Sequence, residues 1–536
     1  MNMLRLPPLL LLFFTFLLLT ACTGPGPSAP TVAIGPTVTP NPDASPTLTP
    51  FSPPVETATS TPIPPTMTLA NTPAPTATPT PTLATASPTA TFPPTLTPTI
   101  TLTPGATFAF VPSTYTLSVM LDYAAHSLIV DETISYQNST GDILNGLVLA
   151  VEPNLSENCF VPGNLTVNGQ AIPNATLNAD RLEIPLAAPL APDGTLSLFL
   201  HYDLHLPPAD GAHVFGYNDS QINLVDWYPF IVPYIPGQGW LLHSPAIVGE
   251  HLVYDVSTFD MVLHLTGSIG TAVIAASAPA QRISYGWHYH LENVRSFAFS
   301  ASPNYQTTST KVNGVTVNSY FFGSESAQGQ AVLDEVAKAV TTFDTLFGSD
   351  PYPSLSIVES PFNDGLAYDG LFFLSRDYYI ANNGTTLNNL VDTAVHETAH
   401  QWWFGLVGND QAMEPWLDEA LATYSERLFY EENYPDINTW QAFRIDAYAP
   451  TGWVDSDIYH VVDLRTYTNA VYLRGVQFLQ ALRGRIGDEA FFAFLKDYAT
   501  QMAGQRATSA DFFRILRLHT NASLSDIISA YFQNPH

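Results

Sequence analysis

The chain has 536 residues, enough for two or three globular domains, and 47 acidic against 17 basic side chains give it a formal net charge of −30. A surface this acidic repels phosphate backbones, so the composition argues against nucleic acid as a partner. It argues equally against a polybasic membrane patch. No protein partner can be inferred from it.

The N-terminus has the pattern that is typical of an export signal. Arg5 precedes an almost unbroken apolar run over residues 6–19. As a helix this run would span about 21 Å, short of the roughly 30 Å hydrocarbon core of a bilayer, which is typical of a signal peptide. It ends in the sequence LTAC, whose last residue is Cys22. This ending resembles the bacterial lipobox and implies cleavage before Cys22 and acylation of its sulfur. The alternative is an ordinary secretory signal with a chance cysteine.

After the expected signal peptide (1–22), residues 23–107 differ in composition from the rest of the chain. Thr or Pro occupies 46 of the 84 positions from 23 to 106, and none of these positions is Lys or Arg. Such a segment cannot bury a core, and we expect an extended stalk of up to roughly 260 Å. The expected location is extracytoplasmic, on the bacterial cell surface or the periplasmic face, with the lipid as the only membrane contact. Cys159, the other cysteine, is expected to be a small buried hydrophobe.

The globular part begins near residue 108 and predicts two domains. Short alternating runs such as Tyr115, Leu117, Val119 and Leu121 recur between turn clusters and predict an antiparallel β domain over 108–306. From 307 to 536 the pattern becomes mostly helical. Residues 333–347 place apolar side chains at helical spacing before a glycine, and residues 355–358 predict a strand. Strands followed by helices indicate an α+β domain behind the β domain.

A metal-binding motif lies in this second domain. The sequence HETAH runs from His396 to His400. On a helix, residues four apart lie on one face about 6 Å apart along the axis, so both imidazoles can reach one zinc ion. Glu397 lies beside them and can act as the general base toward a water on that zinc. Glu419 follows within WLDEALATY on a second predicted helix and can complete a His, His, Glu set with an open fourth position. We therefore expect one Zn²⁺ per chain.

These segments resemble the aminopeptidase N family of zinc peptidases (gluzincins). HETAHQWWFG from His396 looks like the family's zinc helix, and WLDEALATY resembles the segment with its glutamate ligand. FGSDPYP (347–353) is similar to the approach to the active-site strand, and AVYLRG (470–475) to the segment with the catalytic tyrosine. The resemblance implies that Tyr472 stabilises the oxyanion of the tetrahedral intermediate. It also implies that the second domain is a thermolysin-like catalytic domain.

The chain departs from the family pattern in two places. The family's Gly-x-Met-Glu-Asn segment, which holds the substrate's backbone and free amine, is replaced by the segment from Gly365 to Gly370. Gly365, Tyr368 and Asp369 are the substrate-binding candidates there, with Tyr368 at the position of the amine-binding glutamate. Only 117 residues follow Glu419, so we expect a short member without the C-terminal helical-repeat domain.

The leading hypothesis is a zinc metallopeptidase, an aminopeptidase acting on extracytoplasmic peptides. A second is a zinc endopeptidase that needs no free N-terminus. A third is a stalked surface protein that binds without catalysis, which Glu397 and Tyr472 argue against because binding alone requires neither.

The lipobox generates a test of the anchor. Cys22→Ser removes the acylated sulfur, so we expect the variant to leave the membrane fraction and appear in the medium or periplasm, as measured by immunoblotting of cell fractions. Equal membrane retention of the Ser variant would show that Cys22 is not the anchor.

Overall fold

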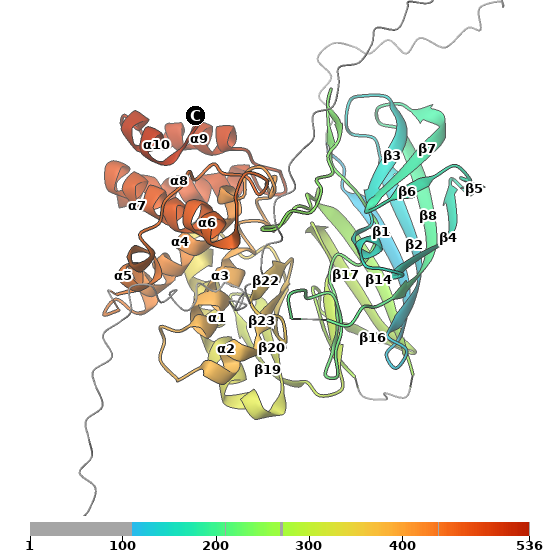
Figure 1. The fold of residues 1–536 in the computed structure, drawn as a ribbon, viewed down its shortest axis with the longest axis horizontal. Coiled ribbons are helices and arrows are strands. Elements are labelled where there is room, and N and C mark those ends of the chain that lie inside the picture. Colours follow the sequence, from blue (N-terminus) through green and yellow to red (C-terminus); the bar gives the residue numbers. More distant parts are fainter. Residues whose placement is uncertain (1–109, 210, 268–271, 438, 535–536) are drawn as a thin grey trace, which may run out of the picture. The chain divides into compact units, whose positions relative to one another are not determined.

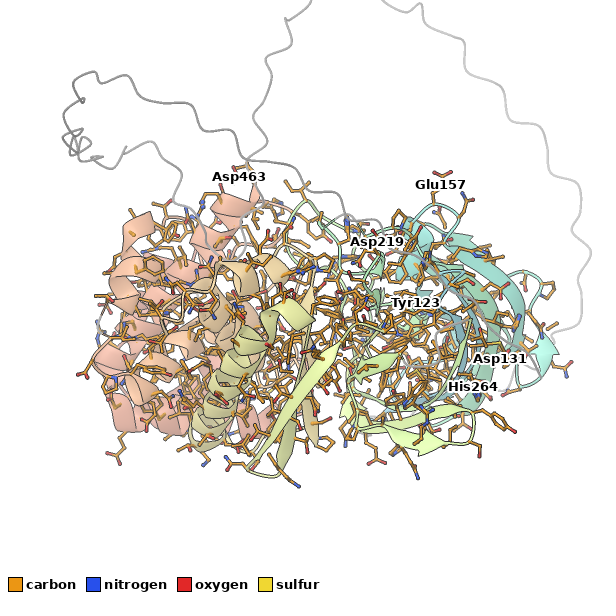
Figure 2. The ribbon with its side chains drawn as sticks, turned by 90° about the horizontal axis from the view of Figure 1, so that it is seen from below. Tyr123, Asp131, Glu157, Asp219, His264 and Asp463 are labelled. Carbon is orange, nitrogen blue, oxygen red and sulfur yellow. The ribbon has the colours of Figure 1, made fainter. Side chains whose placement is uncertain are left out.

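The computed structural model describes residues 110–209, 211–267, 272–437 and 439–534, which belong to one compact unit of the chain. The predicted signal peptide, its Cys22 and the predicted stalk lie outside the described residues. Among the described residues, no helix has both the length and the apolarity that a bilayer span requires. Exposed carboxylates are distributed over several elements, as Figure 2 shows for Asp131, Glu157, Asp219 and Asp463.

The first part of the described chain is built from β-sheets (blue to yellow-green in Figure 1). Alternation along β1 buries Tyr115, Leu117, Val119 and Leu121, as the sequence predicts. Neighbouring strands of the main sheet are antiparallel, except that β1 and β14 pair in parallel. In order across the sheet, the eight strands are β16 (Gln281–Ile283), β17 (Gly286–Val294), β14 (Ser257–Thr266), β1 (Ser113–Asp122), β2 (Ser127–Gln137), β8 (Thr195–His205), β4 (Phe160–Val167) and β5 (Gln170–Ala171).

Smaller sheets complete this part. One contains β11 (Phe230–Ile231), β3 (Leu144–Ala150), β7 (Arg181–Leu190) and β6 (Thr176–Asn178); another contains β15 (Val273–Ala276), β18 (Phe299–Ser302), β10 (Ile222–Leu224) and β9 (Gly216–Tyr217). β12 (Tyr234–Ile235) and β13 (Gly239–Trp240) pair with each other, and a 3₁₀ turn, η1 (Glu152–Leu155), follows β3. Cys159 is a free, buried thiol whose pKa burial raises to about 12, which confirms it as a buried hydrophobe.

The second part contains a five-stranded sheet. Its order is β19 (Gln306–Val312), β20 (Val315–Phe321), β21 (Ser354–Ser360), β23 (Leu371–Ser375) and β22 (Gly365–Tyr368), so the segment that replaces the family's Gly-x-Met-Glu-Asn sequence is an edge strand. The predicted helix between β20 and β21 is α1 (Ser326–Phe347), and its predicted apolar stripe is buried. Gly348 follows it with a positive φ of 113°, which explains the glycine at this end.

The remaining helices run to the end of the described chain (orange to red in Figure 1). They are α2 (Arg376–Ala381), α3 (Asn389–Ala399), α4 (Trp416–Asn433), α5 (Trp440–Arg444), α6 (Leu464–Tyr467), α7 (Arg474–Ile486), α8 (Asp488–Gln501), α9 (Ser509–His519) and α10 (Ser525–Tyr531). A π-helical stretch, η4 (Thr468–Leu473), joins α6 to α7. Thr508 and Asp511 form a capping box at the start of α9. A β domain followed by an α+β domain confirms the predicted fold class.

Asp369, predicted to bind substrate, instead joins the two parts. It lies just after β22, is 1% exposed, and accepts hydrogen bonds from the backbone N–H groups of Arg295 (3.1 Å) and Ser296 (2.7 Å). The hydroxyls of Ser296 and Tyr352 donate to it as well. All of these donors are protein groups, so the carboxylate is structural and the predicted role of Asp369 in substrate binding is corrected.

Because of this contact, we expect substitution of Asp369 to lower the stability of the protein without changing its substrate specificity. Asp369→Asn removes the charge and places amide protons against donors, so we expect the free energy of unfolding to fall by about 3 kcal/mol in urea titrations. Asp131→Asn, at an exposed carboxylate, is the control and should change it by less than about 0.5 kcal/mol. Normal stability, with a selective loss of activity on free-amine peptides, would restore the substrate-binding role.

Candidate metal centre and active site

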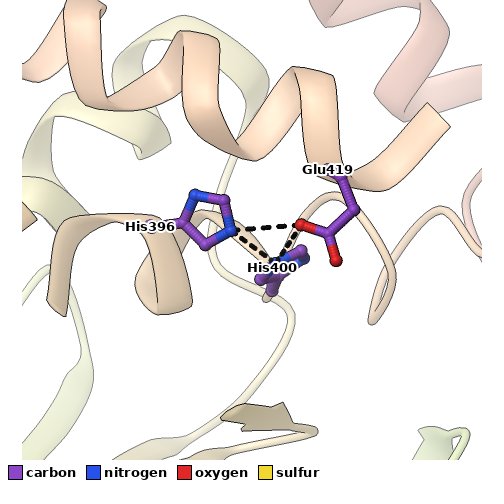
Figure 3. A group of neighbouring side chains, drawn as sticks. All are labelled: His396, His400 and Glu419. Carbon is purple, nitrogen blue, oxygen red and sulfur yellow. Dashed lines mark hydrogen bonds and ion pairs between the residues drawn. The ribbon is translucent and has the colours of Figure 1, made fainter. Parts of the chain in front are cut away.

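The predicted metal ligands converge from two helices (Figure 3). α3 ends at the HETAH motif and α4 carries Glu419 in its first turn. Glu419 Oε2 lies 3.2 Å from His396 Nε2 and 3.5 Å from His400 Nε2, and the two nitrogens are 3.1 Å apart. The structure thus brings all three side chains together in a buried cluster.

The donor set fits a zinc ion. Two imidazole nitrogens and one carboxylate oxygen face one point, and zinc takes such ligands at about 2.0–2.2 Å while leaving a fourth position open. Burial lowers the pKa of each histidine, but bonding and charge from the carboxylates outweigh it and raise both to about 9. Glu419 has its pKa lowered to about 2 because the histidines outweigh its burial. The cluster therefore attracts positive charge, which a dication can supply in place of imidazole protons.

Groups behind the ligands fix their orientation. His396 Nδ1 lies 3.0 Å from Glu426 Oε1, and the Glu426 carboxylate accepts two hydrogen bonds from the Arg444 guanidinium, at 3.0 and 3.1 Å. His400 Nδ1 lies 2.9 Å from the backbone oxygen of Trp403. Such contacts hold a ligating imidazole in one orientation and leave its other nitrogen for the metal. Sequence analysis missed Glu426, although it follows Glu419 by seven residues, two helical turns, on the same face. Arg444 lies on α5, and no sequence pattern indicated that it would pair with Glu426.

A cavity of about 280 Å³ opens beside the cluster. Glu397, His400, Glu419 and Tyr472 all line it. Burial raises the pKa of Glu397 well above its usual value, with the Glu419 charge adding to the effect and His400 opposing it. Burial, and then the Glu419 charge, raise the pKa of Tyr472, so its phenol stays protonated. Tyr472 lies on the π-helical stretch, with its ring stacked 6.1 Å from the His396 ring. Irregular turns of this kind are frequent at functional sites.

The edge strand β22 forms one wall of the cavity. Gly365 lines it, and a Cβ at this position would collide with the Glu397 carboxylate and with Thr393, so only glycine lets the strand approach α3. Tyr368 is not among the lining residues. Its hydroxyl donates to Asp226 Oδ2 of the β domain at 2.8 Å, and only 7% of the residue is exposed. The predicted contact of Tyr368 with substrate is therefore corrected, because its hydroxyl is bound to Asp226 and its side chain does not line the cavity.

An acid that the sequence did not single out enters the cavity from the β domain. Glu250 lines it, on an irregular segment between β13 and β14. Burial, and then the Glu419 charge, raise its pKa to about 7. Asp364, another lining acid, accepts hydrogen bonds from Tyr378 and from Gly365 N. Glu250 makes no side-chain hydrogen bond to another described residue, so its carboxylate is available to a ligand.

The β domain, the mixed sheet and the paired ligand helices together build the candidate zinc site and its cavity. Residues 363–531 match the family model described as the Peptidase family M1 domain. Aminopeptidase N of Lactobacillus delbrueckii subsp. lactis is 27% identical over 304 residues, which cover 52% of this chain and 36% of that protein. Aminopeptidase M1-D of Oryza sativa subsp. japonica is 24% identical over 241 residues, covering 41% and 28%. The chain thus spans about a third of the length of these curated relatives.

Solved structures give the same fold. A mutant M1 zinc metallopeptidase from Deinococcus radiodurans superposes with a TM-score of 0.60 at 18% identity, covering 79% of this chain and 94% of that one. The same enzyme bound to a Tyr-Ser-Ala substrate gives 0.59 at 17% identity, with the same coverage. Together the comparisons confirm the resemblance to the aminopeptidase N family, and the chain carries a peptidase family M1 domain.

The geometry distinguishes the metal ligands from Glu397, which lies beside them but is not a ligand. His400→Ala and Glu419→Ala each remove a donor atom, so we expect each to lower the zinc content by about one ion per chain, measured by plasma mass spectrometry after dialysis. Glu397→Gln should keep the wild-type zinc content because Glu397 is not a donor. Loss of zinc in the Glu397 variant, or its retention in both ligand variants, would contradict this assignment.

Proposed function

We propose that the protein is a zinc-dependent metallopeptidase, and more specifically an aminopeptidase. The observation that carries this proposal is the convergence of His396, His400 and Glu419 beside the unligated Glu397 in one cavity. When bound there, zinc supplies Lewis acidity and lowers the pKa of a coordinated water toward about 7. The names of the relatives and of the solved structures support the same activity.

Glu397 serves as the general base. It adjoins the first metal ligand and lines the cavity, and burial makes its carboxylate more basic than a carboxylate in water. A base of raised pKa accepts a proton from water more readily and can pass it on to the leaving amine. Removing the carboxylate should therefore abolish turnover while the ligands stay in place.

Tyr472 serves as the hydrogen-bond donor to the oxyanion. Its phenol is kept protonated by burial and by the negative charge nearby. A donor fixed in a buried site stabilises charge that develops in the transition state, because little reorganisation is required. The π-helical backbone around it sets the direction of this side chain toward the cluster.

Glu250 takes the part of the amine-binding acid that Tyr368 does not fill. A substrate ammonium in a partly dry cavity needs a carboxylate partner, since an unpaired buried charge is costly. Glu250 provides one, in a cavity whose described lining residues include four acids and no Lys or Arg. This arrangement favours exopeptidase action at a free N-terminus.

The second candidate is an endopeptidase, favoured by the missing family glutamate at Tyr368. The substrates we propose for either activity are extracytoplasmic peptides, because the N-terminus resembles a lipoprotein signal followed by a Thr/Pro-rich spacer. We propose that acylated Cys22 tethers the enzyme to the outer face of a bacterial membrane. One catalytic zinc per chain completes the proposal.

The amine contact separates the two candidates. We expect N-acetylation of a peptide to lower kcat/KM by about 10²–10³-fold, because it removes the charge that pairs with Glu250. Glu250→Gln should lower kcat/KM for free peptides by a similar factor, while leaving the acetylated ones almost unchanged. Glu157→Gln, at an exposed acid of the β domain, is the matched control and should have no effect.

Equal cleavage of acetylated and free peptides, at internal bonds, would instead establish the endopeptidase. Absence of any cleavage by the zinc-loaded protein across a mixed peptide library would favour the non-catalytic binding protein.

A further inference from the structure

A second cluster of metal-ligating side chains lies in the β domain. Glu152 begins η1 after β3, Asp180 lies in the turn between β6 and β7, and His251 directly follows Glu250. One ligand atom from each of the three lies within 4.8 Å of the others. His251 Nε2 is 3.3 Å from Glu152 Oε2. The cluster shares no residue with the catalytic centre.

An unsatisfied buried oxygen points to a ligand here. Asp180 is only 7% exposed, and its Oδ2 is buried without a hydrogen-bond partner. A buried carboxylate oxygen in this state costs free energy unless a cation or a donor meets it. The guanidinium of the neighbouring Arg181 pairs with Glu183 at 2.8 Å; its charge lowers the pKa of Asp180 from a distance, but it makes no hydrogen bond to the buried Oδ2.

We propose that Glu152, Asp180 and His251 bind one divalent transition-metal ion of the zinc type. An imidazole nitrogen among the donors favours zinc and its neighbours over calcium or magnesium, which prefer oxygen ligands. Two carboxylates neutralise the charge of a dication, and three protein donors leave room for water. Small side-chain rotations bring the three atoms to ligand distance, since donors of a tetrahedral site lie about 3.4 Å apart.

The ion has a positioning role. Two of the ligand-bearing segments are already joined, because Val151 N donates to Asp180 O at 2.6 Å and Asn154 Nδ2 donates to Ala179 O at 2.5 Å. The metal adds the third segment, the irregular one that carries His251. Since Glu250 precedes His251, the ion fixes the backbone that holds Glu250 in the catalytic cavity.

The test isolates this site from the catalytic one. In the full-length His396→Ala/His400→Ala double variant, stripped of metal and titrated with Co²⁺ and with Zn²⁺ by calorimetry, we expect about one equivalent to bind. Addition of Asp180→Asn should remove this binding. Addition of His201→Gln is the matched control, because His201 forms a surface pair with Asp131 at 2.7 Å, and should leave one equivalent.

If the double variant does not fold, the number of zinc ions bound per chain tests the proposal directly. Wild-type protein saturated with zinc and then dialysed against zinc-free buffer should hold two ions per chain, and Asp180→Asn or the milder Glu152→Gln should hold one. A wild-type content of one ion that Asp180→Asn leaves unchanged would overturn the proposal and leave an ordinary cluster of ion pairs. So would a folded double variant that binds no metal. Neither result bears on the catalytic zinc, which the His400→Ala variant reports separately.

Discussion

The second part of the structure depends on one constraint: three buried ligand atoms must point at the same spot. His396 and His400 meet Glu419 only if α3 and α4 pack at close range, and both helices are consequently buried. Burial on this scale obliges the polar side chains of α4 to find partners: Glu426 pairs with Arg444. Gly475 lets α7 approach α4 where a Cβ would strike Ala420, and so brings the nearby Tyr472 toward the cluster.

The β domain contributes to the same site from outside. Arg295 donates through Nε to the backbone oxygens of Phe404 and Gly405, just after the histidine motif, at 2.7 and 3.0 Å. Asp369 fixes the end of β22, and Tyr368 binds Asp226 across the same boundary. The edge strand and the loop after α3 are therefore held from the β domain, which also supplies Glu250. The β domain and the α+β part therefore both contribute residues and contacts that build the site.

Sequence patterns within single elements predicted those features that depend on interactions between residues close in sequence. Helical spacing predicted α1 and the shared face of the two histidines, and strand alternation predicted the buried face of β1. Glu250 gave no signal because its partners lie far away in sequence and its segment has no regular periodicity. Asp369 was misassigned because it follows the strand at the turn with Gly370, whose φ is 68°, so alternation does not set its direction. Contacts between distant segments decided both cases.

The charges around the cavity bear on which end of a peptide enters it. Burial raises the pKa of Asp364 well above its usual value, which disfavours its charged form. Burial shifts the pKa of Glu397 in the same direction, whereas the histidines lower the pKa of Glu419 to about 2. A bound zinc dication would favour the charged forms of Glu397 and Glu419, and a substrate ammonium would favour the charged form of Glu250. An internal peptide segment is neutral and would leave Glu250 without a partner. Glu250 would then have to bind a proton, which its pKa of about 7 allows only near or below neutral pH. Above that pH, the proposed selection of a free N-terminus would depend on the charge of this one side chain.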